Sequence, residues 1–334
     1  MMKSNIRPIL SKLNFYLRHN PFIERNRDSK IYIPSGFKTV ILISADFEMA
    51  WASRYSKKNK EDALKIALIK ANRERININM ILEICDHYQI PLTWATVGHL
   101  FLRKCKKENG IIHKEIPKVR KYYGTYWDFM GEDWFEFDPC SNYREAPEWY
   151  APDIISQIIN SKVKHEIACH TFSHIDCRDN ICPPELMKAE LQLCKSLASQ
   201  WGIDLKSFVH PGHTIGNLDI LVQEGFNNFR TDYRNVLGYP IKHENGLWEF
   251  EQTAELVYRK EWSVDYHIYR YITIIKRAIE SNTVCVFWFH PSFDTVVVEK
   301  ILPEVFRFLK ENEDKIWVTT HGNYVEWLEN TKKY

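Results

Sequence analysis

Residues 39–48 read TVILISADFE. The first seven form a short apolar run rich in β-branched side chains, which is typical of a strand buried on both faces. Asp46 and Glu48 follow at alternate positions, so both carboxylates are expected on the same side at the C-terminal end of that strand. Because α/β enzymes build their sites at the C-terminal ends of parallel strands, this stretch predicts both a core strand and a place for chemistry.

Helical and strand-like patterns alternate along the rest of the chain. Ala71–Tyr88 carries apolar side chains at helical spacing, and Pro91 precedes the apolar run Leu92–Val97. Further helices are predicted at Pro184–Gln200 and Ile268–Glu280, and further strands at Glu166–Cys169, Ser207–Val209, Asn228–Asp232, Leu247–Phe250, Val284–Phe289 and Ile316–Thr320. This order predicts an α/β domain with a mostly parallel sheet that could close as a barrel.

Composition narrows the class of protein. With 334 residues, 45% of them apolar, the chain can bury the core of one barrel-sized domain or of two smaller ones. The 45 basic residues nearly balance the 43 acidic ones, so no nucleic-acid partner is expected. The eight cysteines are scattered without a CxxC pair, and neither a secretory signal nor an apolar run of about 18 residues is evident. These features favour a reduced, cytoplasmic setting.

Residues 1–36 form a basic N-terminal extension, with seven Lys or Arg among the first 30 residues and apolar side chains between them. Two interpretations stay open. The segment packs on or trails from the domain, or it forms a helix that contacts an anionic membrane surface at the inner face of the membrane.

An insertion at about 105–152 interrupts the alternation between the second predicted strand and Glu166–Cys169. It is dense in aromatic residues, namely Tyr122, Tyr123, Tyr126, Trp127, Phe129, Trp134, Phe135, Phe137, Tyr143, Trp149 and Tyr150. Long insertions on such scaffolds are usually functional, and aromatic faces stack on sugar rings. A substrate wall and a self-packed loop with its own small core are both compatible with this pattern.

Three histidines follow predicted strands. His170 and His174 are four residues apart just after Glu166–Cys169, and His290 ends the run Val284–Phe289. Two imidazoles at that spacing can offer neutral nitrogens to one divalent cation, although the spacing alone is a weak signal. The metal-site hypothesis becomes stronger when Asp46 and Glu48 are considered with the histidines. One acid could hold the cation, the other could take a proton from water, and His290 could act as a general acid.

These motifs resemble those of the polysaccharide deacetylase family, also described as NodB-homology or carbohydrate esterase 4-like. The resemblance runs from about Thr39 to Thr320 and rests on D-x-E at 46–48, H-E-I-x-x-H-T-F-S-H at 165–174, V-H-P-G at 209–212 and W-F-H-P at 288–291. It implies a distorted (β/α)7-8 barrel over residues 37–330. It also implies a reaction that removes an N-acyl group, usually acetyl, from an amino sugar. The cofactor that it implies is a divalent metal ion, with Zn²⁺ as the leading candidate.

Carried onto this sequence, the resemblance implies that Asp46 is the catalytic base and that Glu48, His170 and His174 hold the metal. His290 would protonate the leaving amine. The remaining implied positions are Asp232, which would orient His290, and the substrate and oxyanion region His210, Pro211, Gly212, His213 and Trp288.

Two departures from the family pattern concern the acids. Phe47 separates Asp46 from Glu48, where many members have adjacent aspartates, so which acid binds the metal stays open. The family's arginine, which usually pairs with the catalytic aspartate, falls near Val209, so Asp46 is expected to lack that partner. His210, His213 or Arg230 could supply a positive neighbour instead, and without one the pKa of the base would rise.

Three functions are compatible with these motifs. The first is a metal-dependent N-deacetylase that acts on an amino sugar in cell-surface polysaccharide or glycolipid biosynthesis, on a nucleotide-linked or lipid-linked precursor. The second is a deformylase or another amide hydrolase with the same centre. The third is a non-catalytic glycan-binding protein on this scaffold, an alternative suggested by the missing arginine.

Overall fold

A computed structural model describes residues 20–24, 27–55, 59–119, 129 and 133–331. Within these residues, a ten-stranded sheet has the order β10-β11-β2-β3-β4-β5-β6-β9-β8, and β12 also pairs with β2. Every pairing in it is parallel except β8 with β9. Its strands are β2 (Thr39–Phe47), β3 (Thr93–Thr96), β4 (Glu166–Cys169), β5 (Ser207–Val209), β6 (Asn228–Thr231), β8 (Ile241–Lys242), β9 (Trp248–Glu251), β10 (Ala254–Glu255), β11 (Val284–Phe289) and β12 (Ile316–Thr319).

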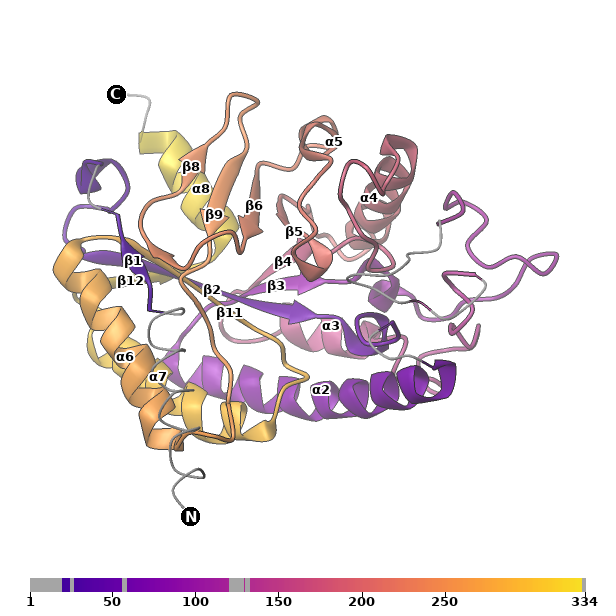
Figure 1. Cartoon of the computed structure of the whole chain (residues 1–334), viewed down its shortest axis with the longest axis horizontal. Helices are drawn as coiled ribbons and strands as arrows, with labels where there is room; N and C mark the ends of the chain where they lie inside the picture. The colour runs from indigo at the N-terminus through magenta and orange to yellow at the C-terminus, as the bar shows by residue number, and fades with distance from the viewer. Residues whose placement is uncertain (1–19, 25–26, 56–58, 120–128, 130–132, 332–334) are drawn as a thin grey trace, which may run out of the picture.

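Strand β2 is the centre of the sheet. All nine of its residues are buried, as the uninterrupted apolar run predicted. One edge of β2 pairs with β11 from Val40 to Ala45, while its other edge pairs first with β12 and then, from Ser44 onward, with β3. This change of partner distorts the sheet, which curls as a (β/α) barrel of the expected type (Figure 1).

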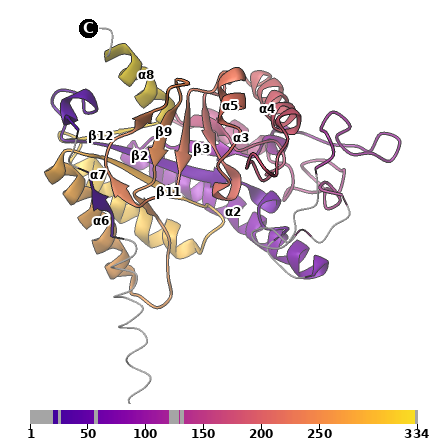
Figure 2. The same ribbon diagram turned by 45° about the horizontal axis from the view of Figure 1, so that its top comes forward.

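Helices cover the outside of the curled sheet. In Figures 1 and 2, α2, α6 and α7 lie along one side, and α4, α5 and α8 lie along the other. The α-helices are α2 (Lys60–Tyr88), α3 (Pro152–Ile159), α4 (Pro184–Ser199), α5 (Leu218–Gln223), α6 (Val264–Ser281), α7 (Leu302–Glu311) and α8 (His321–Thr331). Short 3₁₀ turns are η1 (Ser29–Ile31), η2 (Met49–Trp51), η3 (Gly98–Phe101) and η4 (Pro211–His213), and η5 (Val297–Ile301) is a π-helical turn before α7.

Local signals explain where the longer helices begin and end. Asn59 caps α2 by accepting from the Asp62 N–H, and Gln89 ends the helix in the left-handed conformation. Ser263 caps α6 in the same way, and Asn282 ends it with a positive φ. Helix α2 begins eleven residues before the predicted start at 71, at the position that the Asn59 cap determines.

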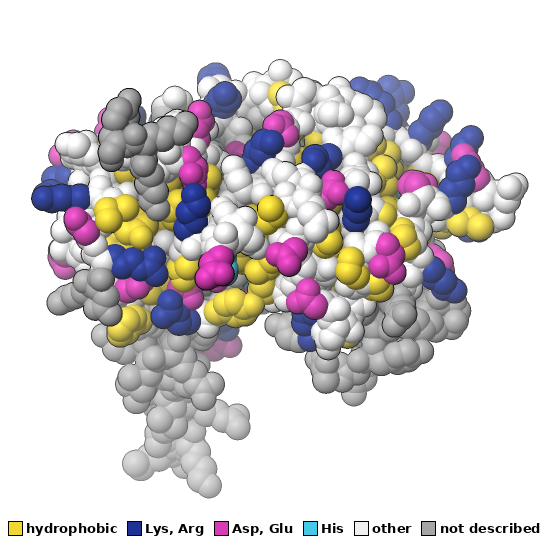
Figure 3. All heavy atoms as spheres, turned by 90° about the horizontal axis from the view of Figure 1, so that it is seen from above, with side chains coloured by type: hydrophobic (Ala, Val, Ile, Leu, Met, Phe, Trp, Pro, Cys, Tyr) yellow, Lys and Arg dark blue, Asp and Glu magenta, His cyan; other side chains and the backbone are white. Residues whose placement is uncertain are grey.

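The described part of the predicted N-terminal extension packs on the domain. Strand β1 (Phe22–Ile23) pairs in parallel with β7 (Val236–Leu237), and Arg27 donates to the carbonyl of Pro240. The basic apolar stretch proposed for membrane contact falls mostly on residues 1–19, outside the described residues. Among the described helices, none is long and apolar enough to cross a membrane. On the face in Figure 3, basic and acidic side chains are interspersed, as the near balance of charge leads one to expect.

The aromatic insertion has its own core, which is continuous with that of the barrel. Its buried rings are Phe129, Trp134, Phe135, Phe137, Trp149 and Tyr150, and they pack in one cluster with Trp51 and Phe172. Trp127 and the three tyrosines at 122, 123 and 126 lie outside the described residues. The self-packed interpretation therefore accounts for the described part of the insertion, in which the buried ring of Trp134 stacks on Tyr55.

Candidate metal centre

The acids and histidines singled out from the sequence meet at the C-terminal ends of three strands of the sheet. Asp46 is the penultimate residue of β2 and Glu48 follows that strand, while His170 and His174 follow β4 and His290 follows β11. A cavity of about 200 Å³ opens over them. Besides four of these residues it is lined by Ala52, Ser53, Tyr55, Lys70, His210, Gly212, His213, Ser292 and Phe293.

Glu48 lies between the two histidines of the HxxxH motif. Its Oε1 is 3.1 Å from Nε2 of His170 and 3.0 Å from Nε2 of His174, and all three side chains are buried. Asp46, by contrast, lies in a group with Glu48 and His290. The geometry therefore groups Glu48, rather than Asp46, with the two histidines.

The imidazole rings of His170 and His174 each have a polar partner at Nδ1, the nitrogen that faces away from Glu48. Nδ1 of His170 donates to the Val209 carbonyl at 2.7 Å, and Nδ1 of His174 lies 2.5 Å from the Tyr55 hydroxyl. Each ring thereby turns its Nε2 atom toward the Glu48 carboxylate. Burial lowers the pKa of His174 to about 4, so this ring is neutral at pH 7. Two imidazole nitrogens and a carboxylate that converge in this way fit a divalent cation.

Two buried glutamates hold the loops that carry these ligands. Glu74 of α2 accepts from the N–H groups of Glu48 and Met49 at 3.0 and 2.9 Å. Glu190 of α4 accepts from the N–H groups of Phe172 and Ser173 at 2.7 and 2.8 Å. Met49 and His174 adopt left-handed backbone conformations, with φ of 53° and 59°, which these bonds help to maintain.

Glu74 and Glu190 were not among the predicted residues, although the sequence held a signal for both. Each glutamate occupies a position in the apolar stripe of its helix, between Ala71 and Ile78 in α2 and between Met187 and Cys194 in α4. A carboxylate in such a stripe must find partners inside the protein. Here the partners are backbone N–H groups of the site loops.

The expectation that Asp46 lacks a cationic partner is wrong. Arg230, on β6, donates from both terminal nitrogens to the two oxygens of Asp46, at 2.8 and 2.7 Å, and also to the Ser44 hydroxyl. Burial raises the pKa of Asp46, but the charge and hydrogen bonds of Arg230 outweigh it and bring the pKa below its usual value. Of the three candidates for a positive neighbour of Asp46, Arg230 is the one that fills this role, because β6 brings its guanidinium to both carboxylate oxygens.

His290 lies beside the two acids of the site, in one group with Asp46 and Glu48. Its Nε2 is 3.6 Å from Oε2 of Glu48, and its Nδ1 is 4.0 Å from Oε1 of Glu255. Burial lowers the pKa of His290, but the carboxylates of Glu48, Asp46 and Glu255 outweigh it and raise the pKa to about 9. A ring in this setting is protonated at neutral pH, as a general acid must be.

Asp232 is not placed to orient His290. Its carboxylate lies 3.7 Å from Nδ1 of His213, whereas the acid beside Nδ1 of His290 is Glu255, on β10. The loose match in the sequence thus selected the wrong acid, since Asp232 directly follows β6 and faces His213. A two-residue strand such as β10 gave no pattern by which Glu255 could be found.

The predicted substrate region lies along the same rim. Pro211, Gly212 and His213 form η4, with left-handed φ angles of 53° and 56° at the last two residues, and His210 donates through Nε2 to the Gly216 carbonyl. The ring of Trp288 stacks on the guanidinium of Arg230, 4.7 Å away, and donates its N–H to Gln252. Trp288 therefore supports the Arg230–Asp46 pair from beneath.

Comparison with solved structures identifies this architecture. A protein from Mycobacterium smegmatis assigned as a polysaccharide deacetylase superposes with a TM-score of 0.63 at 14% identity, over 92% of this chain and 96% of that one. A Pseudomonas aeruginosa PAO1 protein assigned to the same class gives 0.59 at 12% identity, over 90% and 94%. The chain has the polysaccharide-deacetylase fold.

This fold is not restricted to proteins described as polysaccharide deacetylases. The allantoinase Puue superposes with a TM-score of 0.61 at 12% identity, over 92% of this chain and 96% of that one. No family model matches the sequence, and comparison with curated proteins gives no match. The expected resemblance is thus confirmed for the polysaccharide-deacetylase fold, while the chemistry rests on the residues of the site.

Proposed function

We propose that this protein is a metal-dependent hydrolase that removes an N-acyl group from an amino sugar, with acetyl as the leading candidate for that group. The observation that supports this most strongly is the contact of one Glu48 oxygen with both HxxxH imidazoles, beside an arginine-paired aspartate and a cationic histidine. Amide hydrolysis needs these parts together: a cation site, a base for water and an acid for the departing amine.

Each side chain has a distinct task in the proposed reaction. Glu48, His170 and His174 would hold a divalent ion, with zinc favoured by the nitrogen and oxygen donors, and the ion would supply a Lewis acid for the amide carbonyl. Asp46 accepts a proton from the attacking water, and Arg230 keeps Asp46 ionised and fixes its two oxygens. His290 donates a proton to the leaving nitrogen.

The cavity wall supports a sugar-sized substrate. Tyr55 stacks on Trp134 of the insertion with ring centroids 5.9 Å apart, and Tyr55 itself lines the cavity beside Glu48. Aromatic faces of this kind bind the apolar faces of sugar rings. Tyr55 would therefore supply the aromatic part of the cavity wall, with Trp134 of the insertion packed behind it.

An adjoining cavity is the place considered for the carrier of the sugar. This cavity, of about 260 Å³, shares His213 with the cavity of the site and is lined by two arginines, Arg259 and Arg270, together with two acids, Asp232 and Glu255. Guanidinium groups bind phosphate oxygens in a bidentate manner. A nucleotide-linked or lipid-linked amino sugar in cell-surface polysaccharide or glycolipid biosynthesis would fill both cavities.

A second candidate keeps the centre and changes the amide. The Puue allantoinase shares this fold, which supports a formyl group or a non-sugar amide as the alternative substrate. The third hypothesis, a non-catalytic glycan-binding protein, was suggested by the lack of a cationic partner for Asp46, and Arg230 is such a partner.

A substrate screen tests the proposal. Purified protein would be incubated with nucleotide-linked, lipid-linked and free N-acetyl and N-formyl amino sugars, and acetate, formate and free amine would be measured. The proposal predicts acetate release that is abolished by His170→Ala. Release of formate alone would favour the second candidate, and release of neither acid by metal-loaded protein would contradict the proposal.

A further inference from the structure

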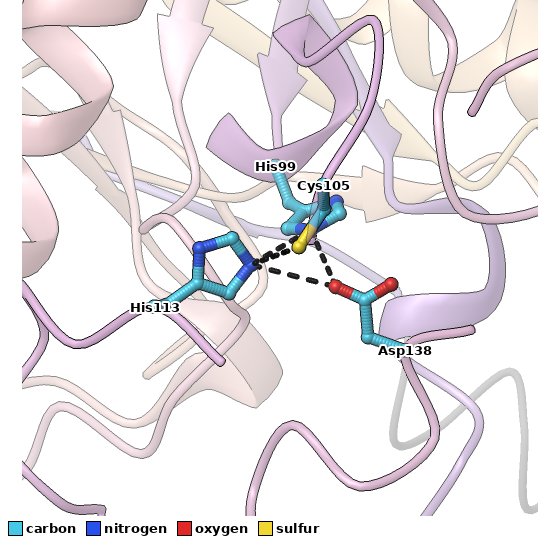
Figure 4. A group of neighbouring side chains, drawn as sticks. All are labelled: His99, Cys105, His113 and Asp138. Carbon is cyan, nitrogen blue, oxygen red and sulfur yellow. Dashed lines mark hydrogen bonds and ion pairs between the residues drawn. The ribbon is translucent and has the colours of Figure 1, made fainter. Parts of the chain in front are cut away.

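A second group of metal-binding side chains lies outside the candidate metal centre. His99, Cys105, His113 and Asp138 point toward one another from four separate segments, with their ligand atoms all within 4.8 Å (Figure 4). His99 is in η3, just after β3, and the other three residues belong to the insertion. None of the four was predicted as a ligand, because their spacing in the sequence matches no known ligand motif.

The distances within this second cluster are those of a coordination sphere. Nε2 of His99 is 3.1 Å from Nε2 of His113 and 3.0 Å from Oδ2 of Asp138, and Nε2 of His113 is 3.4 Å from the same oxygen. Sγ of Cys105 is 3.6 Å from Nε2 of His113. Four donors bound tetrahedrally to zinc are separated by about 3.3 to 3.8 Å, so a small shift would complete the site.

Hydrogen bonds on the outer side leave lone pairs at the centre of the cluster. Nδ1 of His99 donates to the Trp149 carbonyl at 3.2 Å, and Nδ1 of His113 faces the Glu115 carboxylate at 3.3 Å. With Nδ1 engaged on the outer side, each ring turns its Nε2 atom toward the other ring and toward Oδ2 of Asp138. Metal-bound histidines show this same outer hydrogen bond, which fixes the tautomer.

Asp138 is also held by hydrogen bonds on its outer side. Its other oxygen, Oδ1, accepts from the Tyr150 hydroxyl at 2.5 Å and from the N–H of Cys140 at 2.9 Å, which leaves Oδ2 for the centre of the cluster. The side chains of His99 and Asp138 are fully buried, and that of His113 is nearly so. Cys105 is partly exposed. Lone pairs that converge in such a largely buried site repel one another unless a cation lies among them.

We propose that His99, Cys105, His113 and Asp138 bind a second divalent metal ion, zinc by the chemistry of the ligand set, in a closed structural site. Four protein ligands complete a tetrahedron and leave no position for substrate, which distinguishes a structural from a catalytic zinc site. The thiolate and imidazoles favour zinc over magnesium or calcium. This inference does not depend on the proposed deacylase function.

The second site would fasten the insertion to the loop that carries His170 and His174. The N–H groups of Gly98 and His99 donate to the carbonyls of Thr171 and Phe172 at 2.8 and 2.9 Å. The ring of Phe172 also packs against His99 and His113, with centroids 5.4 and 4.9 Å apart. Metal bound at this place would link the insertion, η3 and the histidine loop in one unit.

The test separates the two metal sites by their ligands. The double variant His170→Ala/His174→Ala removes ligands of the candidate metal centre, so metal that remains reports on the second site. Full-length protein would be purified in reductant with zinc, dialysed against a weak chelator, and measured for zinc content and by X-ray absorption. The proposal predicts one zinc per chain with one sulfur ligand at about 2.3 Å.

Further substitutions in that background identify the ligands. Cys105→Ser or His113→Ala should reduce retained zinc at least tenfold, while Cys140→Ser, whose thiol lies 4.0 Å from that of Cys105, should retain it. Retention of no zinc by the folded double variant would overturn the proposal. A zinc without sulfur, or loss of zinc in Cys140→Ser but not in Cys105→Ser, would overturn it as well.

A measurement on unaltered protein guards against variants that fail to fold. The candidate metal centre contains no sulfur among its described ligands, so cobalt at that place gives no thiolate-to-metal charge-transfer absorption. Cobalt-substituted wild-type protein should show this near-ultraviolet band, and Cys105→Ser should lack it while Cys85→Ser, a buried cysteine of α2, keeps it. Absence of the band from wild-type protein loaded with two equivalents of cobalt would contradict the second site.

Discussion

Arg230 and Asp46 are separated by 184 residues in the chain and form a buried bidentate ion pair at the mouth of the barrel. The pair connects β6 to β2 across the sheet, and Trp288 covers the guanidinium. Two parallel hydrogen bonds fix both position and ionisation of the carboxylate. We therefore expect the pair to determine both stability and the activity of the base.

Removal of one partner should be more harmful than removal of both charges. Arg230→Met leaves Asp46 buried and unpaired, and should lower the free energy of unfolding by about 3–5 kcal/mol. Asp46→Asn in that background should restore part of this loss. Urea denaturation of the four proteins measures the coupling, and strictly additive effects would contradict a direct interaction.

Asp46→Asn alone separates base chemistry from metal binding. The amide keeps the shape of Asp46 but cannot accept the proton, so turnover should fall by about 10² to 10⁴-fold while metal content stays unchanged. Metal analysis and initial rates of acid release on the same preparation provide the comparison. Loss of metal together with activity would show instead that Asp46 is a ligand.

Tyr55→Phe tests the outer support of His174. The hydroxyl 2.5 Å from Nδ1 fixes the ring, and loss of such a partner typically weakens metal affinity by about 10–100-fold. Competition with a chromophoric chelator measures the affinity. Tyr258→Phe, a tyrosine that packs on His267 and does not line the cavity, serves as control, and equal affinities in all three proteins would exclude the proposed support.

Glu190 should tolerate glutamine but not alanine. A glutamine oxygen can accept from the N–H groups of Phe172 and Ser173 while its amide donates to the Ser173 hydroxyl, which now donates to Glu190 at 2.7 Å. Alanine leaves these buried donors without an acceptor, at a cost of about 1–3 kcal/mol each. Thermal unfolding and metal affinity distinguish the two variants, and an alanine variant as stable as the glutamine variant would contradict the role assigned to Glu190.

Buried histidine should make the protein less stable in acid. Burial, together with the charge of Arg230, lowers the pKa of His321 to about 3, whereas a histidine in the unfolded chain titrates at about 6.5. Below about pH 6.5 the unfolded state takes up a proton that the folded state does not, so the free energy of unfolding falls as the pH decreases. Each such group contributes about 1.4 kcal/mol per pH unit.

His321→Asn removes this contribution. Between about pH 6 and pH 4.5, the free energy of unfolding of the variant should decrease less steeply than that of wild-type protein, by about 1.4 kcal/mol per pH unit. Urea denaturation at several pH values gives both slopes, and the difference between them is independent of any loss in absolute stability. Equal slopes would show that His321 is not the source.

The strands were predictable because a buried parallel strand needs an apolar run. Glu166–Cys169 and Val284–Phe289 agree with the structure in both bounds. Helices α7 and α8 were not predicted: α7 continues directly from the π-helical turn η5 with Pro303 in its own first turn, and α8 begins at the end of β12 without an intervening turn signal. The 3.6-residue period alone could not separate α8 from the strand before it.

The candidate metal centre was predictable where it follows strands. Its residues occupy strand ends, and parallel strands bring those ends together. The partner of Asp46 could not be assigned, since which of Arg230, His210 and His213 reaches across the barrel depends on the order of strands. The second cluster, formed by His99, Cys105, His113 and Asp138, could not be predicted. Most of its ligands come from loops, and the course of a loop leaves no periodic pattern in the sequence.

The central claim is that Glu48 and the HxxxH pair bind the metal that makes the site a hydrolase. The most direct test is acid release from N-acyl amino sugars by chelator-treated protein as zinc is returned stepwise, in wild-type protein and in Glu48→Gln. We predict that wild-type activity is lost on chelation and restored by zinc, and that Glu48→Gln stays inactive throughout. Activity that survives removal of the metal, or a Glu48→Gln variant that recovers with zinc to the wild-type level, would contradict the claim.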